Sequence, residues 1–391
     1  NDRGQQRSGR SRSGTEKRNG VLSVAVIGGG IAGLSCAQHL QETGHFDPVV
    51  FDTGRLRPGG RCSSRLPGDD KKRRELGEQI VDHAAQILTA SISQEFAEQV
   101  TKWEHAGVLT RFPAGSVVEV TGKEDSPARS FEIRELNGQI DGQSPAMYYG
   151  THGMGSIASQ IATDADLQVQ QDVWVSPSNG VKYGGKNNAP LWIVRAKGDV
   201  LGEFDRLVIA HNGKCADRLM SKTPAKKLHS LLRVNFASSV PADGGKKMTL
   251  NSIYSLSFAV EKDRSPLTGA LPAHVMSAFI KNEPTLRFIS CHSRKYNEGP
   301  SETEVYTVLS SAPFAKKYKA PQEMIPQDVK EKVTTLLLQA VERAFSLESE
   351  SLSGDGVVLD SRLQLWGAAV PLNTWSESPG FLFDDEFGVG A

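Results

Sequence analysis

The chain has 391 residues, which is room for roughly two or three domain-sized hydrophobic cores. Hydrophobic residues make up 38% and charged residues 23%, a composition typical of a soluble globular protein. Lysine plus arginine and aspartate plus glutamate number 45 each, and this balance argues against nucleic acid as the main partner, because phosphate binding needs a positive excess. No apolar run of the sequence reaches the length of a transmembrane helix.

The N-terminal segment, residues 1–20, is rich in Arg, Ser and Gly and predicts a disordered tail. Two interpretations of it stay open: the remnant of a transit peptide to a plastid or another organelle, and an ordinary polar tail. The four cysteines include no C-x-x-C pair, so neither a zinc or other metal site nor a disulfide framework is indicated. Isolated, reduced thiols fit a reducing compartment.

The first structured segment begins with SVAVI, residues 23–27, a β-branched run that predicts a buried parallel strand. Gly28, Gly30 and Gly33 follow as G-x-G-x-x-G, and the residues after them place apolar side chains at helical spacing. Gly44 is expected to end this helix in a left-handed conformation. The next strand, PVVFD, ends at Asp52, 19 positions after Gly33.

A strand, a glycine-rich turn, a helix and an acid in this order predict a dinucleotide-binding site. Gly28 permits the tight turn, Gly30 lets the backbone approach a pyrophosphate, and Gly33 lets the helix and strand pack closely. The helix N-terminus offers unpaired N–H groups to the phosphates, and Asp52 can accept hydrogen bonds from ribose hydroxyls. NAD-binding and FAD-binding motifs use the same glycines, helix N-terminus and acid, so this motif does not decide between NAD and FAD.

A second glycine pair, Gly59 and Gly60, follows in PGGR and precedes Arg61. A nicotinamide-only domain has no need of a second glycine-rich loop at this place, whereas a flavin held along its length does. Arg61 can face a phosphate or the flavin edge as a fixed cation. This loop therefore favours FAD.

These two motifs resemble the flavin amine oxidase superfamily, and within it the renalase-like FAD/NAD(P)-binding oxidoreductases. The resemblance covers most of the chain, from about residue 21 to the end, and further segments match in order. Those segments are VDHAAQILTA (81–90), YYGTHGMGSIASQIA (148–162), DVWV (172–175) and FDRLVIAHN (204–212).

The resemblance implies FAD as the cofactor and an α/β fold, with an FAD-binding Rossmann-like (two-dinucleotide-binding) domain and a mixed α+β substrate domain. It also implies that residues 81–90 form a strand whose backbone meets the flavin, and 172–175 a strand whose backbone meets the adenine. The cofactor-binding residues that it implies are Gly28, Gly30, Ile31, Ala32, Gly33, Asp52, Gly59, Gly60, Arg61, Ala85, Gln86 and Val173.

Two departures from the superfamily stand out. A glycine–aspartate motif usually closes over the flavin near the C-terminus, and FGVGA, residues 387–391, looks like the strand that leads into it. Two expectations stay open: that the sequence is a fragment, or that FAD binding is impaired. No lysine matches the one that many amine oxidases place near the flavin, so an amine substrate is not favoured.

The FAD domain is expected to be discontinuous, with segments 21–90, 147–214 and 360–391, and the substrate domain to comprise 91–146 and 215–359. Residues 91–107 and 326–345 predict helices, the second with Pro326 at its start and an apolar face. β-Branched and aromatic runs predict strands at 131–135, 252–263, 274–282, 286–294 and 305–311. This pattern indicates a mixed sheet backed by helices.

The flavin would carry the redox step, so the sequence assigns no catalytic residue. Aromatic and histidine side chains at predicted strand ends are pocket candidates, with packing as the alternative; they are Tyr148, Tyr149, His152, His211, Trp366 and His83. A covalent flavin link at Cys62 is not expected.

The function expected is that of an FAD-dependent oxidoreductase. It would transfer a hydride from a small reduced substrate, such as a dihydronicotinamide-type or NAD(P)H-type donor, to flavin and on to oxygen or another acceptor. Two alternatives stay open: an NAD(P)-dependent dehydrogenase, and a non-catalytic binding or assembly protein that kept the fold.

Overall fold

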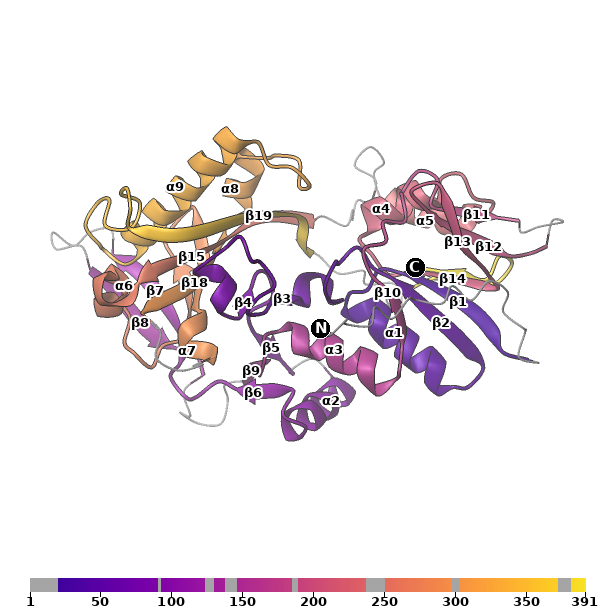
Figure 1. Ribbon diagram of the computed structural model, residues 1–391, viewed down its shortest axis with the longest axis horizontal. Helices are drawn as coiled ribbons and strands as arrows, with labels where there is room; N and C mark the ends of the chain where they lie inside the picture. Colours follow the sequence, from indigo (N-terminus) through magenta and orange to yellow (C-terminus); the bar gives the residue numbers. More distant parts are fainter. Residues whose placement is uncertain are drawn as a thin grey trace, which may run out of the picture.

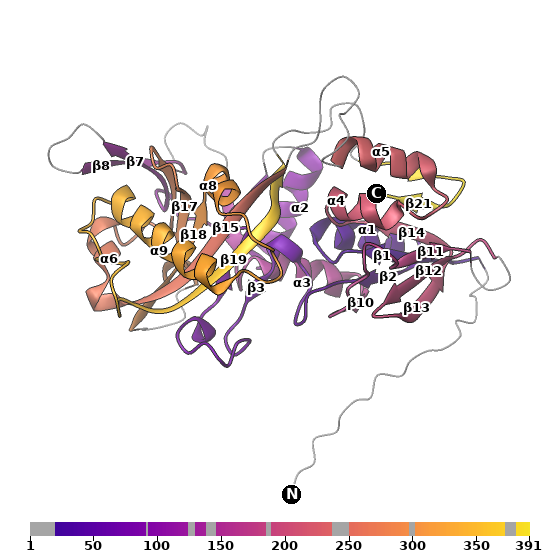
Figure 2. The same cartoon turned by 90° about the horizontal axis from the view of Figure 1, so that it is seen from above.

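The computed structural model describes residues 20–90, 93–123, 130–137, 146–184, 189–236, 250–296, 302–371 and 381–391. The tail expected at residues 1–20 thus lies outside the described residues except for Gly20. A six-stranded sheet and a seven-stranded sheet occupy opposite ends of an elongated molecule, with α2, α3 and short strands between them (Figures 1 and 2). Among the helices of the described residues, none is long and apolar enough to cross a membrane.

The six-stranded sheet is the nucleotide-binding type that the first motif predicts. Its first five strands run parallel, and the last pairs antiparallel to its neighbour. In spatial order the strands are β10 (Gln168–Gln170), β2 (Phe46–Phe51), β1 (Leu22–Ile27), β14 (Arg206–Ile209), β21 (Val389–Gly390) and β20 (Phe383–Asp384).

Strand β1 is central and buried on both faces, as its β-branched run predicts. Val24 and Val26 face one core, shared with helices α1 (Ile31–Glu42), α2 (Gln94–His105) and α3 (Gly155–Asp164). Ala25 and Ile27 face another core, which includes α4 (Gly213–Met220), α5 (Lys226–Phe236) and a three-stranded meander. The meander strands are β11 (Val181–Tyr183), β12 (Trp192–Ala196) and β13 (Asp199–Phe204).

The seven-stranded sheet is mixed and backed by a helix. Helix α9 (Gln327–Ala344) begins after Pro326, as predicted, and packs its apolar face on one side of the sheet. β7 and β16 are parallel and the other neighbours antiparallel. In spatial order the strands are β19 (Val358–Pro371), β15 (Leu250–Glu261), β18 (Thr303–Ser310), β17 (Leu286–Cys291), β16 (Ser277–Lys281), β7 (Val117–Lys123) and β8 (Ser130–Glu135).

Short elements connect the two sheets. β5 (Leu88–Thr89), β9 (Met147–Gly150) and β6 (Leu109–Arg111) form a three-stranded sheet, and β3 (Ser64–Arg65) pairs with β4 (Val81–Asp82). The seven-stranded sheet also carries the short helices α6 (Pro266–Ala270), α7 (His292–Tyr296) and α8 (Ala312–Lys317).

Two expected segment boundaries differ from the structure. Residues 358–371 were expected mostly in the FAD domain, yet they form β19, which pairs along β15 because their alternating pattern suits a long antiparallel strand. Residues 94–111 were expected in the substrate domain, yet Val100, Trp103 and Leu109 join the core that β1 and α1 build. Burial of apolar side chains decides both placements.

Two expected strands are also wrong. Residues 81–90 contain only the two short strands β4 and β5, joined by a loop at 83–87. Residues 172–175 are not a strand; Val175 alone forms a bridge, with Ala196. Asp172 has φ +55°, a left-handed conformation that interrupts extended backbone.

Candidate functional site

The first glycine turn requires glycine at Gly28 and Gly33. Gly28 has φ +118°, and its N–H donates to the carbonyl of Phe51 at 2.9 Å. A Cβ on Gly33 would lie 1.9 Å from the carbonyl oxygen of Gly28, so α1 could not sit this close to the turn with a side chain there. The helix ends as predicted, with Gly44 at φ +71°.

The N-terminus of α1 is open to a ligand. Gly30 occupies the N-cap position with extended backbone and no side-chain cap, and a Cβ built on it would meet nothing within 4 Å. The first N–H groups of a helix have no partner inside the helix and form its positive end. Open space before such a terminus fits the phosphates of a dinucleotide.

The second glycine loop lies directly against the first. The Gly59 N–H donates to the Gly29 carbonyl at 2.7 Å, and Gly59 forms a parallel bridge with Gly30. Gly59 and Gly60 have φ +133° and +56°, so both need the freedom of glycine. The two glycine loops come from different parts of the sequence, and they lie side by side at the N-terminus of α1.

Arg61 links this double loop to the other half of the molecule. Its guanidinium donates to the carbonyl of Ala369 on β19. Its own carbonyl accepts the N–H of Ala85 at 2.9 Å, which holds the 83–87 loop beside the glycines. Arg61 is exposed, in keeping with a cation at the edge of a site.

Asp52 lies at the C-terminal end of β2 and is 7% exposed. Its carboxylate accepts the N–H groups of Gly29 at 3.2 Å and Gly54 at 3.1 Å. Burial raises the pKa of Asp52, although these backbone hydrogen bonds oppose the increase. The Val173 N–H donates to the Asp52 carbonyl at 2.9 Å, so Val173 borders the same place. An acid here suits a ribose diol and disfavours a 2′-phosphate.

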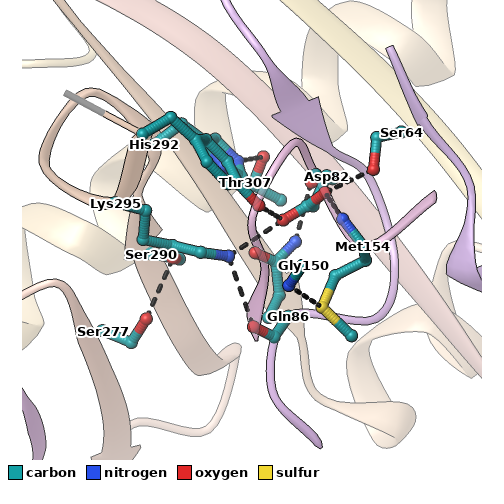
Figure 3. A network of polar contacts seen from close by, with 12 residues as sticks. Ser64, Asp82, Gln86, Gly150, Met154, Ser277, Ser290, His292, Lys295 and Thr307 are labelled. Carbon is teal, nitrogen blue, oxygen red and sulfur yellow. Dashed lines mark hydrogen bonds and ion pairs between the residues drawn. The ribbon is translucent and has the colours of Figure 1, made fainter. Parts of the chain in front are cut away.

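A fully buried ion pair joins the two halves of the molecule (Figure 3). Lys295 Nζ lies 2.9 Å from the Asp82 carboxylate, and both side chains are 0% exposed. The same carboxylate accepts hydrogen bonds from Ser64 Oγ at 2.6 Å and from the Met154 N–H at 2.8 Å. The Tyr296 hydroxyl donates to it as well. Asp82 therefore has partners on every side.

Lys295 also supports the loop that borders the glycines. Its Nζ donates to the Gln86 carbonyl at 3.3 Å, and the Gln86 amide donates to the Asp82 carbonyl at 2.7 Å. The ammonium lies 5.1 Å from the ring centre of Tyr296 and 5.6 Å from that of Tyr149. Cation–π contacts and backbone hydrogen bonds together stabilise the charge of this ammonium group, which is buried away from solvent.

Burial and charge set the protonation states of this network. Burial would raise the pKa of Asp82, but the Lys295 charge acts together with the other partners of the carboxylate, and their combined effect lowers the pKa to about 2. Burial lowers the pKa of His292 to about 3 and that of His83 to about 4, so both histidines are neutral at pH 7. His292 Nε2 contacts Thr307 Oγ1 at 2.8 Å. Burial raises the pKa of Cys62 to about 12, and it stays a thiol.

An apolar cavity of about 560 Å³ opens beside the 83–87 loop. Ala84, Gln86 and Ile87 line it from the loop, and Val370 lines it from β19, next to the carbonyl that Arg61 contacts. The lining residues Ala84, Gln86 and Val370 are thus chain neighbours of Ala85 and Ala369, the two residues that hydrogen bond to Arg61. Pockets of this size and character hold small organic substrates.

The pocket residues predicted from the sequence do not all lie together in the structure. Tyr149 is buried and borders Lys295, and the Trp366 indole donates to the His83 carbonyl at 3.1 Å while its ring stacks on His83. Tyr148 is buried in β9, and His152 is exposed on a turn. Tyr149, His83 and Trp366 therefore lie around the 81–87 segment.

The buried position of Lys295 and the role of Asp82 were not predicted from the sequence. No lysine matched the superfamily position, yet Lys295 contacts the carbonyl of Gln86 in the segment expected to meet the flavin. Lys295 stands in the polar stretch CHSRKY, where a lysine predicts exposure. Its neighbours His292 and Tyr296 stack on each other and offered the one local signal, aromatic residues four positions apart on a helix.

A comparison with protein families matches the part of the chain that contains both glycine loops and Asp52. Residues 26–102 match the NAD(P)-binding Rossmann-like domain. Three solved structures resemble 89–90% of the chain at 10–11% identity, which shows the fold alone. The chain is therefore an α/β protein whose residues 26–102 resemble an NAD(P)-binding Rossmann-like domain.

The three structures cover similar shares of the chain. One is a reduced UDP-galactopyranose mutase, with TM-score 0.54, covering 90% of this chain and 83% of that one. Another is an oxidoreductase from Methanosarcina mazei, with TM-score 0.55 and coverage of 90% and 89%. The third is a fatty acid isomerase from P. acnes, with TM-score 0.53 and coverage of 89% and 86%.

Proposed function

We propose that the protein is an FAD-dependent oxidoreductase of the renalase-like type within the flavin amine oxidase superfamily. The observation that carries the proposal is the contact between the two glycine loops, in which the Gly59 N–H donates to the Gly29 carbonyl. A second glycine loop laid along the first gives a long backbone surface, and a flavin dinucleotide needs one. The neighbouring oxidoreductase structure from Methanosarcina mazei is consistent with this class of reaction.

The residues that would hold FAD come from five segments of the described chain. The open N-terminus of α1 and the glycines would take the pyrophosphate, Asp52 the ribose, Val173 the adenine side, and the 83–87 loop the flavin side. The full set is Gly28, Gly30, Ile31, Ala32, Gly33, Asp52, Gly59, Gly60, Arg61, Ala85, Gln86 and Val173. In this arrangement the six-stranded sheet belongs to the FAD domain and the seven-stranded sheet to the substrate domain.

Bound FAD would supply a two-electron acceptor, and the chain's own residues would position the reactants. Arg61 and the Asp82–Lys295 pair fix the 83–87 loop from two sides. The apolar cavity beside this loop would exclude water from a hydride donor, such as a dihydronicotinamide-type molecule, before the electrons pass to oxygen or another acceptor. The neutral histidines, His83 and His292, do not add charge there at pH 7.

An NAD-dependent dehydrogenase is the second candidate, because the matching family is described as NAD(P)-binding. Asp52 favours NAD over NADP, since a carboxylate repels a 2′-phosphate. This candidate requires that no flavin bind. The double glycine loop then has no ligand to explain it.

The deciding experiment is the visible spectrum of the purified protein, followed by denaturation and analysis of any released chromophore. Release of FAD is the expected result. In Gly30→Val the new side chain would extend into the space before α1, so FAD content should fall while folding is kept. Gly269→Val is the matched control, because a Cβ on Gly269 also meets nothing within 4 Å and lies on α6, far from the site.

A protein that remains colourless after incubation with FAD would contradict the proposal, and co-purified NAD would support the second candidate. If FAD is present, anaerobic mixing with dihydronicotinamide isomers should bleach it. Failure of both dihydronicotinamides and amines to reduce bound FAD would reject these substrate classes and favour a non-catalytic role.

A further inference from the structure

The cavity beside the 83–87 loop has an apolar wall built by the seven-stranded sheet. Phe279, Phe288 and Leu309 are direct cross-strand neighbours on β16, β17 and β18, and all three line the cavity. The rings of Phe279 and Phe288 pack edge to face at 5.0 Å. Ile253 on β15 extends the same wall. A ligand in this cavity must therefore present an apolar body.

A row of hydroxyl groups lies next to this apolar row but is already satisfied. Ser277 and Ser290 hydrogen bond at 2.9 Å, and Thr307 bonds to Ser257 at 2.8 Å. Within the cavity, Ser310 Oγ accepts the Tyr254 N–H at 2.9 Å and donates to a carbonyl at 3.1 Å. Because these hydroxyls have partners in the protein, they are not free to bind a ligand. Figure 3 shows the pair formed by Ser277 and Ser290.

Arg287 lines the same cavity, together with the polar side chains of Gln86 and Asn251. Among the described residues that line the cavity it is the one with a charged side chain, and it is exposed. One guanidinium nitrogen donates to the carbonyls of Glu283 and Leu286. The carboxylate of Glu283 is held by Arg343 at 2.9 and 3.1 Å. In the described part of the chain, Arg287 therefore has no carboxylate partner.

We infer that the cavity accepts a substrate with an apolar body and one anionic group, and that Arg287 selects this class. This inference rests on the proposed function, because it identifies the cavity as the substrate site. A guanidinium without an acidic partner attracts a carboxylate or phosphate and can form two parallel hydrogen bonds to it. An ammonium ligand would meet the like charge of Arg287 and, among the described residues that line the cavity, no acid.

The test uses three probes that share one apolar body and differ in charge: 4-phenylbutyrate, 4-phenylbutanol and 4-phenylbutylamine. Their dissociation constants are measured by titration calorimetry on the purified full chain, with FAD content recorded on the same sample. The butyrate should bind about fivefold more tightly than the alcohol, and the amine about fivefold more weakly, as expected for a partly exposed charge contact.

Variants assign the preference to one residue. Arg287→Ala should equalise the acid and the alcohol, and Arg287→Lys should keep part of the preference because the charge remains. Lys281→Ala is the matched control, since Lys281 is a surface cation on the neighbouring strand that pairs with Glu119 at 3.6 Å and does not line the cavity. It should leave all three constants unchanged.

Two failures are distinguishable. Equal binding of the three probes to protein that contains FAD, no binding of the acid, or a preference that survives Arg287→Ala would each overturn the inference and leave the proposed function standing. Protein without FAD would instead count against the proposed function, whatever the probes show.

Discussion

Replacing Lys295 with methionine should strongly destabilise the protein. The substitution keeps an unbranched side chain of similar length but deletes the cation that faces Asp82 at 2.9 Å, where both side chains are 0% exposed. The carboxylate would keep hydrogen bonds from Ser64 at 2.6 Å, the Met154 N–H at 2.8 Å and the Tyr296 hydroxyl. It would lose the one positive charge that contacts it among the described residues.

The expected cost is about 3–5 kcal/mol in the free energy of unfolding, because removal of one partner leaves an uncompensated charge in the interior. That is a large part of the roughly 5–15 kcal/mol by which a native domain is stable. Asp82→Asn in the Lys295→Met background removes the other charge and should restore part of the loss. The coupling energy of this double-mutant cycle should reach about 2 kcal/mol or more.

Urea unfolding followed by tryptophan fluorescence gives these values from the transition midpoint and slope. Lys281→Met is the control, because the side chain of Lys281 is 59% exposed and its ion pair should contribute less than about 1 kcal/mol. A loss below about 1 kcal/mol for Lys295→Met, or strictly additive single and double variants, would refute the reasoning that this buried pair stabilises the folded protein.

Two further predictions concern the glycine turn and the buried histidines. Gly33→Ala should reduce stability by about 3 kcal/mol or more in thermal unfolding, because its Cβ would lie 1.9 Å from Gly28, whereas Gly30→Ala has open space and should unfold like the wild type; equal behaviour would contradict this. Stability should also fall as the pH drops below about 6.5, since the unfolded chain protonates histidines that the fold keeps neutral, with pKa values of about 4 for His83 and 3 for His292. Each should account for about 2 kcal/mol between pH 7.5 and 5, so His292→Gln should reduce the loss measured by urea unfolding by about 2 kcal/mol, and an unchanged pH profile would reject that cause.

Features that depend on neighbouring residues could be predicted from sequence. The strand before Gly28, the helix after it and the left-handed Gly44 all follow from local sterics and periodicity, and each appears where expected. The runs that form β15, β17, β18 and α9 were also recognised, because their apolar residues recur at the period of the element.

Features that depend on residues far away in the chain could not be predicted from the sequence. Residues 358–371 read as part of one domain but pair with β15 in the other, because strand pairing is chosen by burial and edge complementarity rather than by the strand itself. The loop at 83–87 was expected as strand, since its sequence does not show that Ala85 hydrogen bonds to Arg61.

The sequence by itself determined the glycine turn, because a missing Cβ is a local requirement that Gly28 and Gly33 meet wherever the chain folds. Only the tertiary structure decided that Lys295 would be buried against Asp82, 213 positions away, and that no acid among the described residues would pair with Arg287. A charged residue looks the same in sequence whether water or a carboxylate solvates it. Its state is set by partners that folding brings together across the chain.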